Sequence, residues 1–260
     1  MKVLIAGAGI GGLTTALMLH ARGIPVQIYE TATEVREAGV GINILPHAIR
    51  ELETLGLLPE LDIVGLRTRR LTYYTRSGQE VWSELRGTYA GHEVPQFSIH
   101  RGRLQNLLYK AVLDRLGPEA VQTGRRLGGF VQQDRGVTAH FANSIDGSTG
   151  VTVRSDVLIC CDGIHSAGRK VFYPNEKSPS WNGVMMWRGA VDWPAWQDSE
   201  SMAIGGGLGG KFVLYPITQA KDGRQLMNWV VNVRVKDPAI SPQPANNWSR
   251  KVSLALVLPH

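Results

Sequence analysis

The chain has 260 residues, of which 43% are hydrophobic and 19% are charged, and these proportions exclude global disorder. The net charge of +6 is spread over scattered basic residues, which predicts ordinary solubility and no nucleic-acid interface. The chain contains no run of about 18 uncharged apolar residues, so no membrane span is predicted.

The first 30 residues predict a strand, a helix and a second strand. Residues 2–6 form a short apolar run, and residues 11–22 repeat apolar side chains at helical spacing before Gly23 ends the helix. Residues 26–30 are a second apolar run. Elements in this order predict a parallel βαβ unit with a right-handed crossover.

The middle of the chain predicts further helices and strands. Expected are a helix over residues 46–55, hairpin strands over 71–75 and 80–83, and a helix over 101–116. The run DVLICC at 156–161 is mostly apolar, which is typical of a strand buried on both faces of a parallel sheet. Cys160 and Cys161 at its end are expected to be small buried residues, and two adjacent cysteines fit a reducing cytoplasm.

The character of the chain changes after about residue 172. The segments that follow are rich in β-formers, punctuated by Gly and Pro, with GGGLGG at 205–210 expected as a flexible loop between strands. The predicted fold is therefore α/β, with a parallel sheet and an added antiparallel sheet. Residues 1–70 and 97–172 are assigned to a nucleotide-binding domain, and residues 71–96 and 173–260 to a β-rich domain.

The spacing Gly7-x-Gly9-x-x-Gly12 follows the first strand and opens the first helix, as in a dinucleotide-binding turn. Such a turn uses its first glycine for the bend, its second for approach to a pyrophosphate and its third for close helix packing. The N–H groups at the start of the helix can bind the anion. Glu30 ends the second strand, where a carboxylate accepts ribose hydroxyls and repels a 2′-phosphate, so FAD or NAD is expected in preference to NADP.

Three features favour FAD over NAD. Arg101 and Arg103 lie in a first helical turn, where a bound phosphate would relieve their repulsion by the helix dipole, although a solvated basic turn is the alternative. Asp162-Gly163 follows a predicted strand, where α/β sheets bind ligands, although Asp-Gly is also common in plain turns. The β-rich second half of the chain could cover a flavin ring.

These residues give the chain a resemblance to the class A FAD-dependent aromatic monooxygenases, the family of para-hydroxybenzoate and salicylate hydroxylases. The chain is most similar to the 5-methylphenazine-carboxylate monooxygenase branch. The matching segments are residues 7–12 with Glu30, GVGINILPHAI at 39–49, FSIHRGRL at 97–104, DGIHSAGR at 162–169, MWRG at 186–189 and YPI at 215–217.

The resemblance implies a role for each matched position. The residues expected to bind FAD are Gly7, Ala8, Gly9, Ile10, Gly11, Gly12, Glu30, Val40, Gly41, Arg101, Leu127 and Asp162. Asp162 would also line the approach of NADH or NADPH, and residues 39–43 would run near the flavin ring. No catalytic side chain is assigned; Tyr215, Pro216, Trp187 and Arg188 are candidates for the substrate side. His47, His100 and His165 are expected to be structural, and no metal site is expected.

The family chemistry implied is hydroxylation of an aromatic small molecule, expected to be carboxylated and of phenazine-like size. In that chemistry NAD(P)H reduces FAD, and the reduced flavin reacts with O₂ to give a C4a-hydroperoxide that transfers oxygen. A cytoplasmic location is expected, and the oligomeric state is left open. Two alternatives remain at this point: an NAD-dependent dehydrogenase with the same opening, and an FAD-binding piece without activity.

The chain departs from the family pattern at one motif. Relatives carry a Gly-Asp pair whose Asp binds the flavin ribityl chain, and no Gly-Asp pair occurs in this sequence. The expected fold is therefore the family fold, incomplete at its C-terminus. These 260 residues alone are expected to show at most slow, uncoupled NAD(P)H oxidation.

Overall fold

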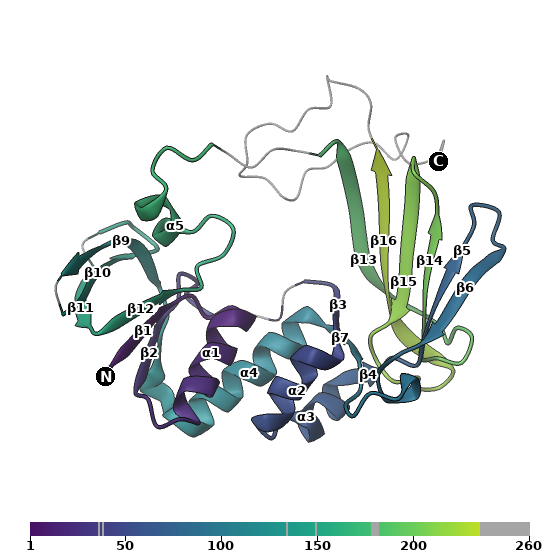
Figure 1. Cartoon of the computed structure of the whole chain (residues 1–260), viewed down its shortest axis with the longest axis horizontal. Coiled ribbons are helices and arrows are strands. Elements are labelled where there is room, and N and C mark those ends of the chain that lie inside the picture. Colours follow the sequence, from purple (N-terminus) through teal and green to yellow (C-terminus); the bar gives the residue numbers. More distant parts are fainter. Residues whose placement is uncertain (36, 38, 134, 149, 178–181, 235–260) are drawn as a thin grey trace. The chain divides into compact units, whose positions relative to one another are not determined.

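A computed structural model describes residues 1–35, 37, 39–133, 135–148, 150–177 and 182–234 (Figure 1). Its contacts group into two compact units. Unit 1 consists of Met1–Ala38, Leu52–Leu57 and Arg101–Glu176. Unit 2 consists of Gly39–Glu51, Leu58–His100 and the described part of Lys177–His260. The units differ from the domains predicted above mainly in placing residues 39–51, 58–70 and 97–100 in unit 2, and the division into cofactor and substrate domains stays a prediction.

Unit 1 is built on a four-stranded parallel sheet. Its strands, in spatial order, are β12 (Val157–Cys160), β1 (Val3–Ala6), β2 (Val26–Tyr29) and β8 (Val121–Gln122). Helix α1 (Ile10–His20) connects β1 to β2, which confirms the predicted βαβ unit. Helix α4 (Arg101–Leu116) packs against α1 and has the predicted bounds.

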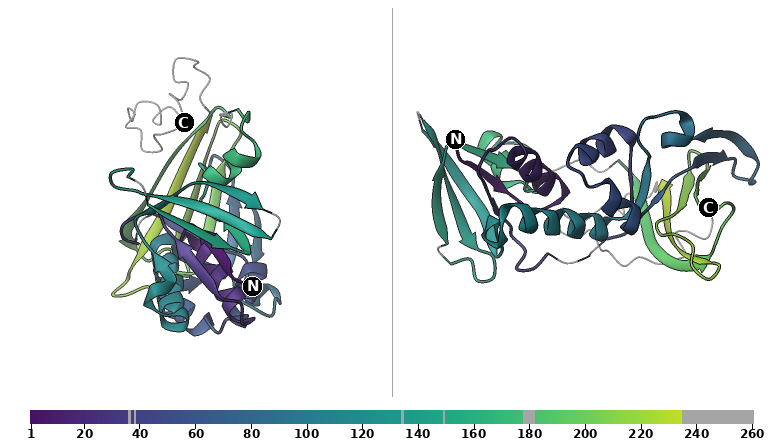
Figure 2. Two further views of the ribbon diagram at one scale, coloured as in Figure 1. Left: turned by 90° about the vertical axis from the view of Figure 1, so that its left-hand side faces the viewer. Right: turned by 90° about the horizontal axis from the view of Figure 1, so that it is seen from below.

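A second, antiparallel sheet of unit 1 packs against the first. It consists of β9 (Arg125–Gln133), β10 (Gly136–Asn143) and β11 (Val151–Ser155), with β10 in the centre. The core between the sheets contains Leu4 and Ala6 from β1, and the rings of Tyr29 and Phe141 stack with centroids 4.1 Å apart. The short helices of this unit are η2 (Pro118–Ala120) and α5 (Ala167–Phe172). Figure 2 gives two further views of these layers.

Strand β12 corrects one prediction. The sequence predicted a strand buried on both faces, but β12 is the edge of its sheet within the described residues and pairs with β1 alone. Val157 at its start is 38% exposed and Cys160 at its end is also exposed, so the expected burial of both cysteines is wrong for Cys160, while Cys161 is half-buried. An apolar run gives the strand but does not tell whether a neighbour covers its edge.

Unit 2 is built on a six-stranded sheet, which confirms the predicted β-rich half. In spatial order its strands are β13 (Val184–Pro194), β16 (Arg224–Arg234), β15 (Gly210–Pro216), β14 (Ser201–Gly206), β5 (Arg70–Tyr74) and β6 (Glu80–Leu85). Neighbours are antiparallel except β14 and β5. The hairpin β5–β6 is confirmed, while the glycine loop is shorter than expected because Gly205 and Gly206 belong to β14 and Gly210 to β15.

A smaller three-stranded sheet completes unit 2. Strand β7 (Phe97–His100) lies between β3 (Gly41–Ile44) and β4 (Gly65–Arg67), and both pairings are antiparallel. The remaining helices are α2 (Pro46–Thr54), which confirms the helix expected after Pro46, α3 (Leu58–Val64) and η1 (Gly87–Ala90). Among the described residues, no helix has the length and apolar character needed to cross a bilayer.

Candidate functional site

The three glycines of the loop after β1 have different steric environments. A Cβ on Gly7 would lie 2.4 Å from the carbonyl oxygen of Cys161, and the φ of Gly7 is +105°. A Cβ on Gly12 would lie 1.9 Å from the carbonyl oxygen of Gly7. A Cβ on Gly9 would meet no atom within 4 Å. Gly7 and Gly12 are therefore required by the close approach of backbone segments, whereas Gly9 leaves open space beside the loop.

Helix α1 begins in this loop without a side-chain cap. Its N-cap residue is Gly9, which has extended backbone angles and no side chain to bond the first-turn N–H groups. The first bond within the helix runs from the N–H of Leu13 to the carbonyl of Gly9. The N–H groups before Leu13 are the usual unsatisfied donors of a helix start, next to the open space at Gly9. This arrangement can bind an anion such as a pyrophosphate.

The carboxylate of Glu30 joins the glycine loop to the end of β2. The N–H of Ala8 donates to Oε2 at 2.6 Å and the N–H of Ala32 donates to Oε1 at 2.7 Å. The side chain of Gln105 on α4 donates to the carbonyl of Ala8 at 3.0 Å and holds the loop from the other side. Each oxygen of an ionised carboxylate can accept a further hydrogen bond, so Glu30 can still bind ribose hydroxyls.

Asp162 lies directly after β12, where Cys161 is bonded to the carbonyl of Ala6 and so fixes this turn beside the glycine loop. The N–H of Gly168 donates to Asp162 Oδ2 at 3.1 Å. The other oxygen, Oδ1, is buried and has no hydrogen-bond partner in the described structure. A buried carboxylate oxygen without a partner points to a donor supplied by a ligand.

The other residues of this segment are engaged in local structure. Ser166 caps α5 by accepting from the N–H of Arg169 at 2.8 Å. The guanidinium of Arg169 is paired with Glu176, with an Nε to Oε2 distance of 2.6 Å. Helix α5 is thereby fixed next to Asp162, and Asp162 is the acidic group of the segment that can bind a ligand.

Two further predicted residues of unit 1 differ in exposure. Arg101 begins α4 and is exposed to solvent, so its guanidinium can reach an anion. The side chain of Leu127 is 5% exposed and packs in the core with Leu4 and Phe141. Any contact of Leu127 with a ligand would therefore come from its backbone. Gln105 and Ala32 were not predicted, because their hydrogen bonds depend on the folded loop.

The predicted residues Val40 and Gly41 belong to unit 2, where Gly41 is closely packed. Its N–H donates to the side-chain Oδ1 of Asn228 at 2.7 Å. A Cβ on Gly41 would lie 2.7 Å from atoms of both Asn228 and Tyr215. Asn228 is fully buried and its Nδ2 has no partner in the described structure. Asn228 was not predicted, and no sequence pattern links it to a residue so distant in the chain.

The four substrate-side candidates divide between the two faces of the six-stranded sheet. Tyr215 is paired in register with Asn228, and Arg188 is paired with Val230, two residues further along β16. Side chains two residues apart on a strand share a face, so Tyr215 and Arg188 lie on the same side of the sheet. Trp187 and Pro216, each next to one of these residues in the chain, lie on the opposite face.

Tyr215 lies in a buried, apolar environment. Its side chain is 5% exposed, and burial raises its pKa to about 12, an effect that the nearby positive charge of Arg188 opposes. Tyr215 is therefore neutral near neutral pH. It packs in an apolar cluster with Leu71, Met202 and Ile217.

The three histidines of the matched segments lie in different elements. His47 is exposed on α2, and His165 is exposed in the turn before α5. His100 is paired in register with Gly41, and its Nε2 lies 3.1 Å from the carbonyl oxygen of Gly39. No group of three or more His, Cys, Asp or Glu side chains that could hold a metal ion occurs in the described part of the chain.

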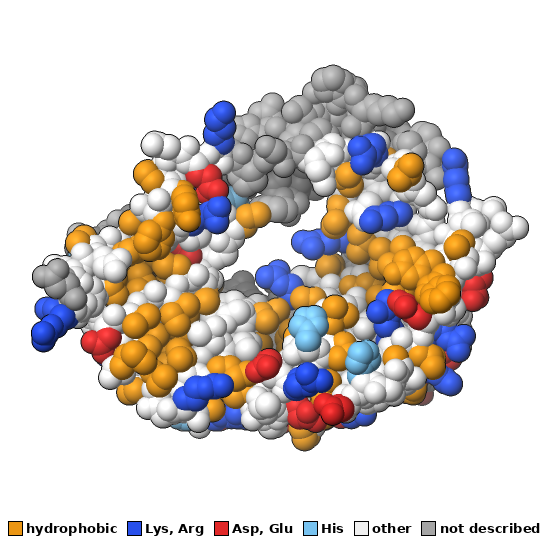
Figure 3. All heavy atoms as spheres, viewed as in Figure 1, with side chains coloured by type: hydrophobic (Ala, Val, Ile, Leu, Met, Phe, Trp, Pro, Cys, Tyr) orange, Lys and Arg blue, Asp and Glu red, His pale blue; other side chains and the backbone are white. Residues whose placement is uncertain are grey.

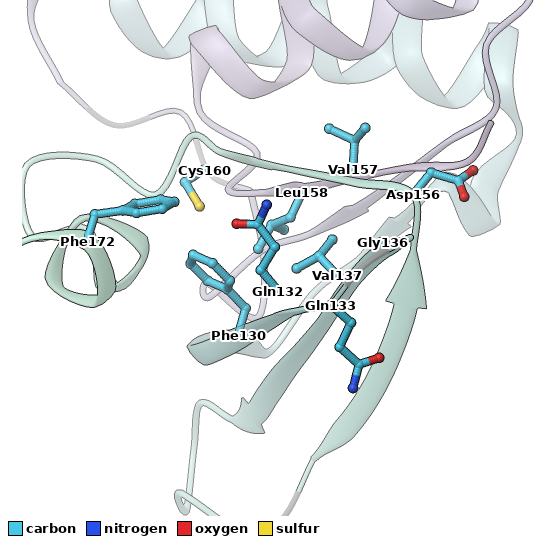
Figure 4. Close-up of a pocket in the computed structure, with 10 residues that line it drawn as sticks. All are labelled: Phe130, Gln132, Gln133, Gly136, Val137, Asp156, Val157, Leu158, Cys160 and Phe172. Atoms are coloured by element: carbon cyan, nitrogen blue, oxygen red, sulfur yellow. The ribbon is translucent and has the colours of Figure 1, made fainter.

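A pocket of about 330 Å³ lies in unit 1 beside β12 (Figure 4). It is lined mainly by the β9–β10 hairpin and by β12, with Phe172 of α5 at one end. The centroids of the Phe130 and Phe172 rings lie 5.4 Å apart in this pocket. Its lining does not include the glycine loop, Glu30 or Asp162, so this pocket is separate from the candidate nucleotide site.

Comparison with known families agrees with this geometry. The sequence matches the FAD binding domain family over residues 1–238. The chain belongs to this family. The glycine loop, Glu30 and Asp162 all lie within the matched range, and the predicted fold class and the FAD assignment are confirmed at the level of the family.

Two curated relatives are a hydroxylase and a monooxygenase by name. The chain is 39% identical to phenazine 1,6-dicarboxylic acid hydroxylase PhzS of Lysobacter antibioticus, over 99% of this chain and 64% of that protein. It is 28% identical to 3-amino-4-hydroxybenzoate 2-monooxygenase of Streptomyces cremeus, over 84% of this chain and 54% of that protein.

A solved structure has a similar fold. Klebsiella pneumoniae HpxO, complexed with FAD and uric acid, superposes with a TM-score of 0.73 at 25% identity, over 95% of this chain and 58% of that chain. The chain therefore spans about 54–64% of the length of these relatives.

Proposed function

We propose that the protein is an FAD-dependent monooxygenase that hydroxylates an aromatic small molecule, with NADH or NADPH as reductant and O₂ as oxidant. The observation that carries this proposal is the combination of family membership with an intact glycine loop bonded to Glu30. The relatives named above act on planar aromatic compounds, and two of them act on aromatic acids by name. The same class of substrate is proposed here.

The residues of unit 1 fit the ADP part of FAD. The open space at Gly9 and the uncapped start of α1 suit a pyrophosphate, and the exposed Arg101 adds a positive charge. Glu30 suits ribose hydroxyls, and its charge disfavours a 2′-phosphate. Asp162 Oδ1 is a buried acceptor that a hydroxyl of the cofactor would satisfy.

When bound, FAD supplies the redox chemistry and the activation of oxygen, and the protein supplies binding and position. In unit 2, the buried and neutral Tyr215 packs closely against Gly41. Close packing of this kind beside a binding site can orient a ring and exclude water from it. We assign the chain's side chains to binding and orientation, and none of them to nucleophilic catalysis.

The cofactor assignment is tested by titrating the 260-residue chain with FAD, and separately with NADH, and following quenching of flavin fluorescence or calorimetric heat. We expect binding of FAD that is weakened by roughly ten- to 150-fold in Glu30→Ala. A chain that binds NADH and not FAD would contradict the proposal and support a dehydrogenase.

The reaction is tested with the protein, or with an intact homologue, in the presence of excess FAD and a panel of aromatic acids. We expect faster NADH or NADPH oxidation and a product heavier by one oxygen atom in mass spectrometry. Stimulation by aliphatic ketones alone would contradict the proposed substrate class.

A further inference from the structure

The pocket beside β12 lies where the two packed sheets of unit 1 meet at an edge. Strand β12 is the edge of the parallel sheet within the described residues, and the β9–β10 hairpin belongs to the antiparallel sheet that packs against it. Figure 4 shows the pocket between these two layers, with the rings of Phe130 and Phe172 and the side chain of Cys160 at one end. The pocket is therefore built into the fold of unit 1 alone.

The walls of the pocket are largely apolar and can be reached from solvent. Val137 from β10 is buried, while Val157 at the edge of β12 is 38% exposed and Phe172 on α5 is 62% exposed. Figure 3 shows hydrophobic side chains on the surface of unit 1 around β12 and α5. The volume of about 330 Å³ falls within the range of pockets that hold small molecules, roughly 300–1,000 Å³.

The described lining of this pocket offers no free charge. Its ionisable residues are Asp156 and Cys160. Asp156 Oδ2 accepts the N–H of Lys2 at 2.6 Å and lies 3.8 Å from the N-terminal amine. Burial raises the pKa of the Cys160 thiol to about 11, so this group is neutral near neutral pH. A charged ligand would lose hydration here without gaining a free opposite charge, so the pocket favours a neutral molecule.

Hydrogen-bonding groups face the pocket from both layers. The exposed side chain of Gln132 on β9 directs its amide toward β12 (Figure 4). The N–H of Asp156 donates to Lys2 beside β1, and bonding directions alternate along a strand, so the N–H and C=O of Val157 point to the open edge. The hydroxyl of Ser155 already donates to the C=O of Val157 at 2.9 Å. The edge of β12 thus presents a backbone donor, and Gln132 presents both a donor and an acceptor.

We propose that this pocket is an accessory site for a small neutral aromatic molecule that carries a carboxamide or lactam group. The ring system packs against Phe130 and Phe172, and the amide group bonds to the side chain of Gln132 and the N–H of Val157. An amide both donates and accepts, which matches these two partners. The lining does not include the glycine loop, Glu30 or Asp162, so the inference goes beyond the proposed function and does not depend on it.

The test compares three naphthalene derivatives of similar shape. The 260-residue chain, without FAD or NAD(P)H, is titrated with 2-naphthamide, 2-naphthoate and N,N-dimethyl-2-naphthamide and followed by NMR of its backbone amides. 2-Naphthamide is expected to shift the signals of Gln132, Val157 and Phe172. At these signals we expect the carboxylate to bind at least about tenfold more weakly, because its charge finds no partner. The dimethylamide should bind about two- to tenfold more weakly, the range for one neutral hydrogen bond.

Two variants test the contacts of the ligand. Gln132→Met keeps the length of the side chain and removes its hydrogen-bonding groups, so the affinity for 2-naphthamide should fall about two- to tenfold. Phe172→Ala removes one ring of the aromatic end and should weaken all three compounds by about two- to tenfold. Both side chains are exposed, so neither substitution should alter the fold.

Gln133→Met is the matched control for Gln132→Met. Gln133 is the next residue of β9 and is also exposed, but its amide points away from the pocket (Figure 4). The same chemical change at this position should leave the affinity for 2-naphthamide unchanged. Signals of unit 2 that match those of the wild type show that each variant keeps its fold.

Three results would overturn the inference. They are 2-naphthamide shifts that are absent or confined to residues outside the pocket, equal affinity of the amide and the carboxylate at the pocket, and equal losses in Gln132→Met and Gln133→Met. Because the titrations contain no cofactor, a failure of the proposed redox function would appear in the FAD titration and would leave these results unaffected.

Discussion

The binding surfaces proposed for the two units consist of different kinds of atoms. In unit 1 the surface around the glycine loop consists mainly of backbone: uncapped N–H groups at the start of α1, open space at Gly9 and two N–H groups bonded to Glu30. In unit 2 the surface consists of side chains that six strands place in rows, with Tyr215 and Arg188 on one face.

This difference determines what each unit tolerates. A surface made of backbone depends on the absence of side chains, so single added methyl groups should be most damaging in unit 1. A surface made of side chains depends on register, so substitutions in unit 2 should change specificity more than folding. The following predictions test this contrast, from the largest expected effect to the smallest.

The largest effect is expected from Gly12→Ala. The added Cβ would meet the carbonyl oxygen of Gly7 at 1.9 Å, and backbone cannot rotate away as a flexible side chain can. Helix α1 would have to move away from β1, at a cost of about 3 kcal/mol or more. Urea unfolding followed by circular dichroism measures this loss.

Gly11→Ala is the control for Gly12→Ala. Gly11 is the adjacent residue of the same helix, and a Cβ there meets no atom within 4 Å. This substitution should be neutral or stabilise the helix by up to about 1 kcal/mol, because Ala is the better helix former. Equal urea midpoints for the two variants would contradict the claim that close backbone approach defines unit 1.

The next effect concerns Glu30 and the affinity for FAD. Glu30→Ala removes an acceptor for ribose hydroxyls and releases the N–H groups of Ala8 and Ala32. A hydrogen bond to a charged group contributes about 1.5–3 kcal/mol, so FAD binding should weaken by roughly ten- to 150-fold. Glu30→Gln keeps one acceptor oxygen and should weaken binding less. Fluorescence titration measures the FAD affinity of both variants. An unchanged affinity in the alanine variant would show that Glu30 does not bind FAD.

The contrast between the units also explains what the sequence could predict. The glycine loop and Glu30 lie within 30 residues, and their spacing follows from the geometry of one βαβ unit. Their placement could therefore be predicted locally. The β5–β6 hairpin and the bounds of α4 could be predicted for the same reason, because each depends on residues close in sequence.

Other features depend on which strands become neighbours. Trp187 and Arg188 are adjacent in the chain, and alternation predicts that they point to opposite faces, but only the register with β16 and β15 shows which of them joins Tyr215. The bond from Gly41 to Asn228 joins residues 187 positions apart. The exposure of β12 likewise depends on its position at a sheet edge, which its apolar composition does not reveal.

A smaller steric effect is expected at Gly41 in unit 2. A Cβ would lie 2.7 Å from side-chain atoms of Asn228 and Tyr215, which can shift more readily than backbone. Gly41→Ala should therefore destabilise by about 1–2 kcal/mol, less than Gly12→Ala. Gly207→Ala, where the Cβ meets no atom within 4 Å, is the control in the same unit. If Gly41→Ala and Gly12→Ala lower the free energy of unfolding equally, the two units tolerate an added methyl group equally poorly, which would contradict the contrast between them.

The smallest effect is expected at Cys160, at the edge of the parallel sheet of unit 1, whose thiol should react slowly with alkylating reagents. Desolvation raises the pKa of Cys160 to about 11 from its ordinary value of 9, and the carboxylate of Asp162 adds to the shift. At pH 8 a shift of two units lowers the thiolate fraction about a hundredfold, and the greater nucleophilicity of a more basic thiolate recovers about tenfold of it. Alkylation of Cys160 by iodoacetamide should thus be about tenfold slower than that of a free cysteine, and its rate should rise steeply between pH 9 and 11.

The raised pKa also makes the stability of the fold depend on pH. Folding favours the thiol form of Cys160, so the stabilisation from this residue is present below pH 9 and is lost as the pH rises through 11. Mass spectrometry of tryptic peptides follows the modification, and Asp162→Asn should make the thiol faster by removing the negative charge. Alkylation at the rate of a free cysteine at pH 8 would contradict the raised pKa of Cys160.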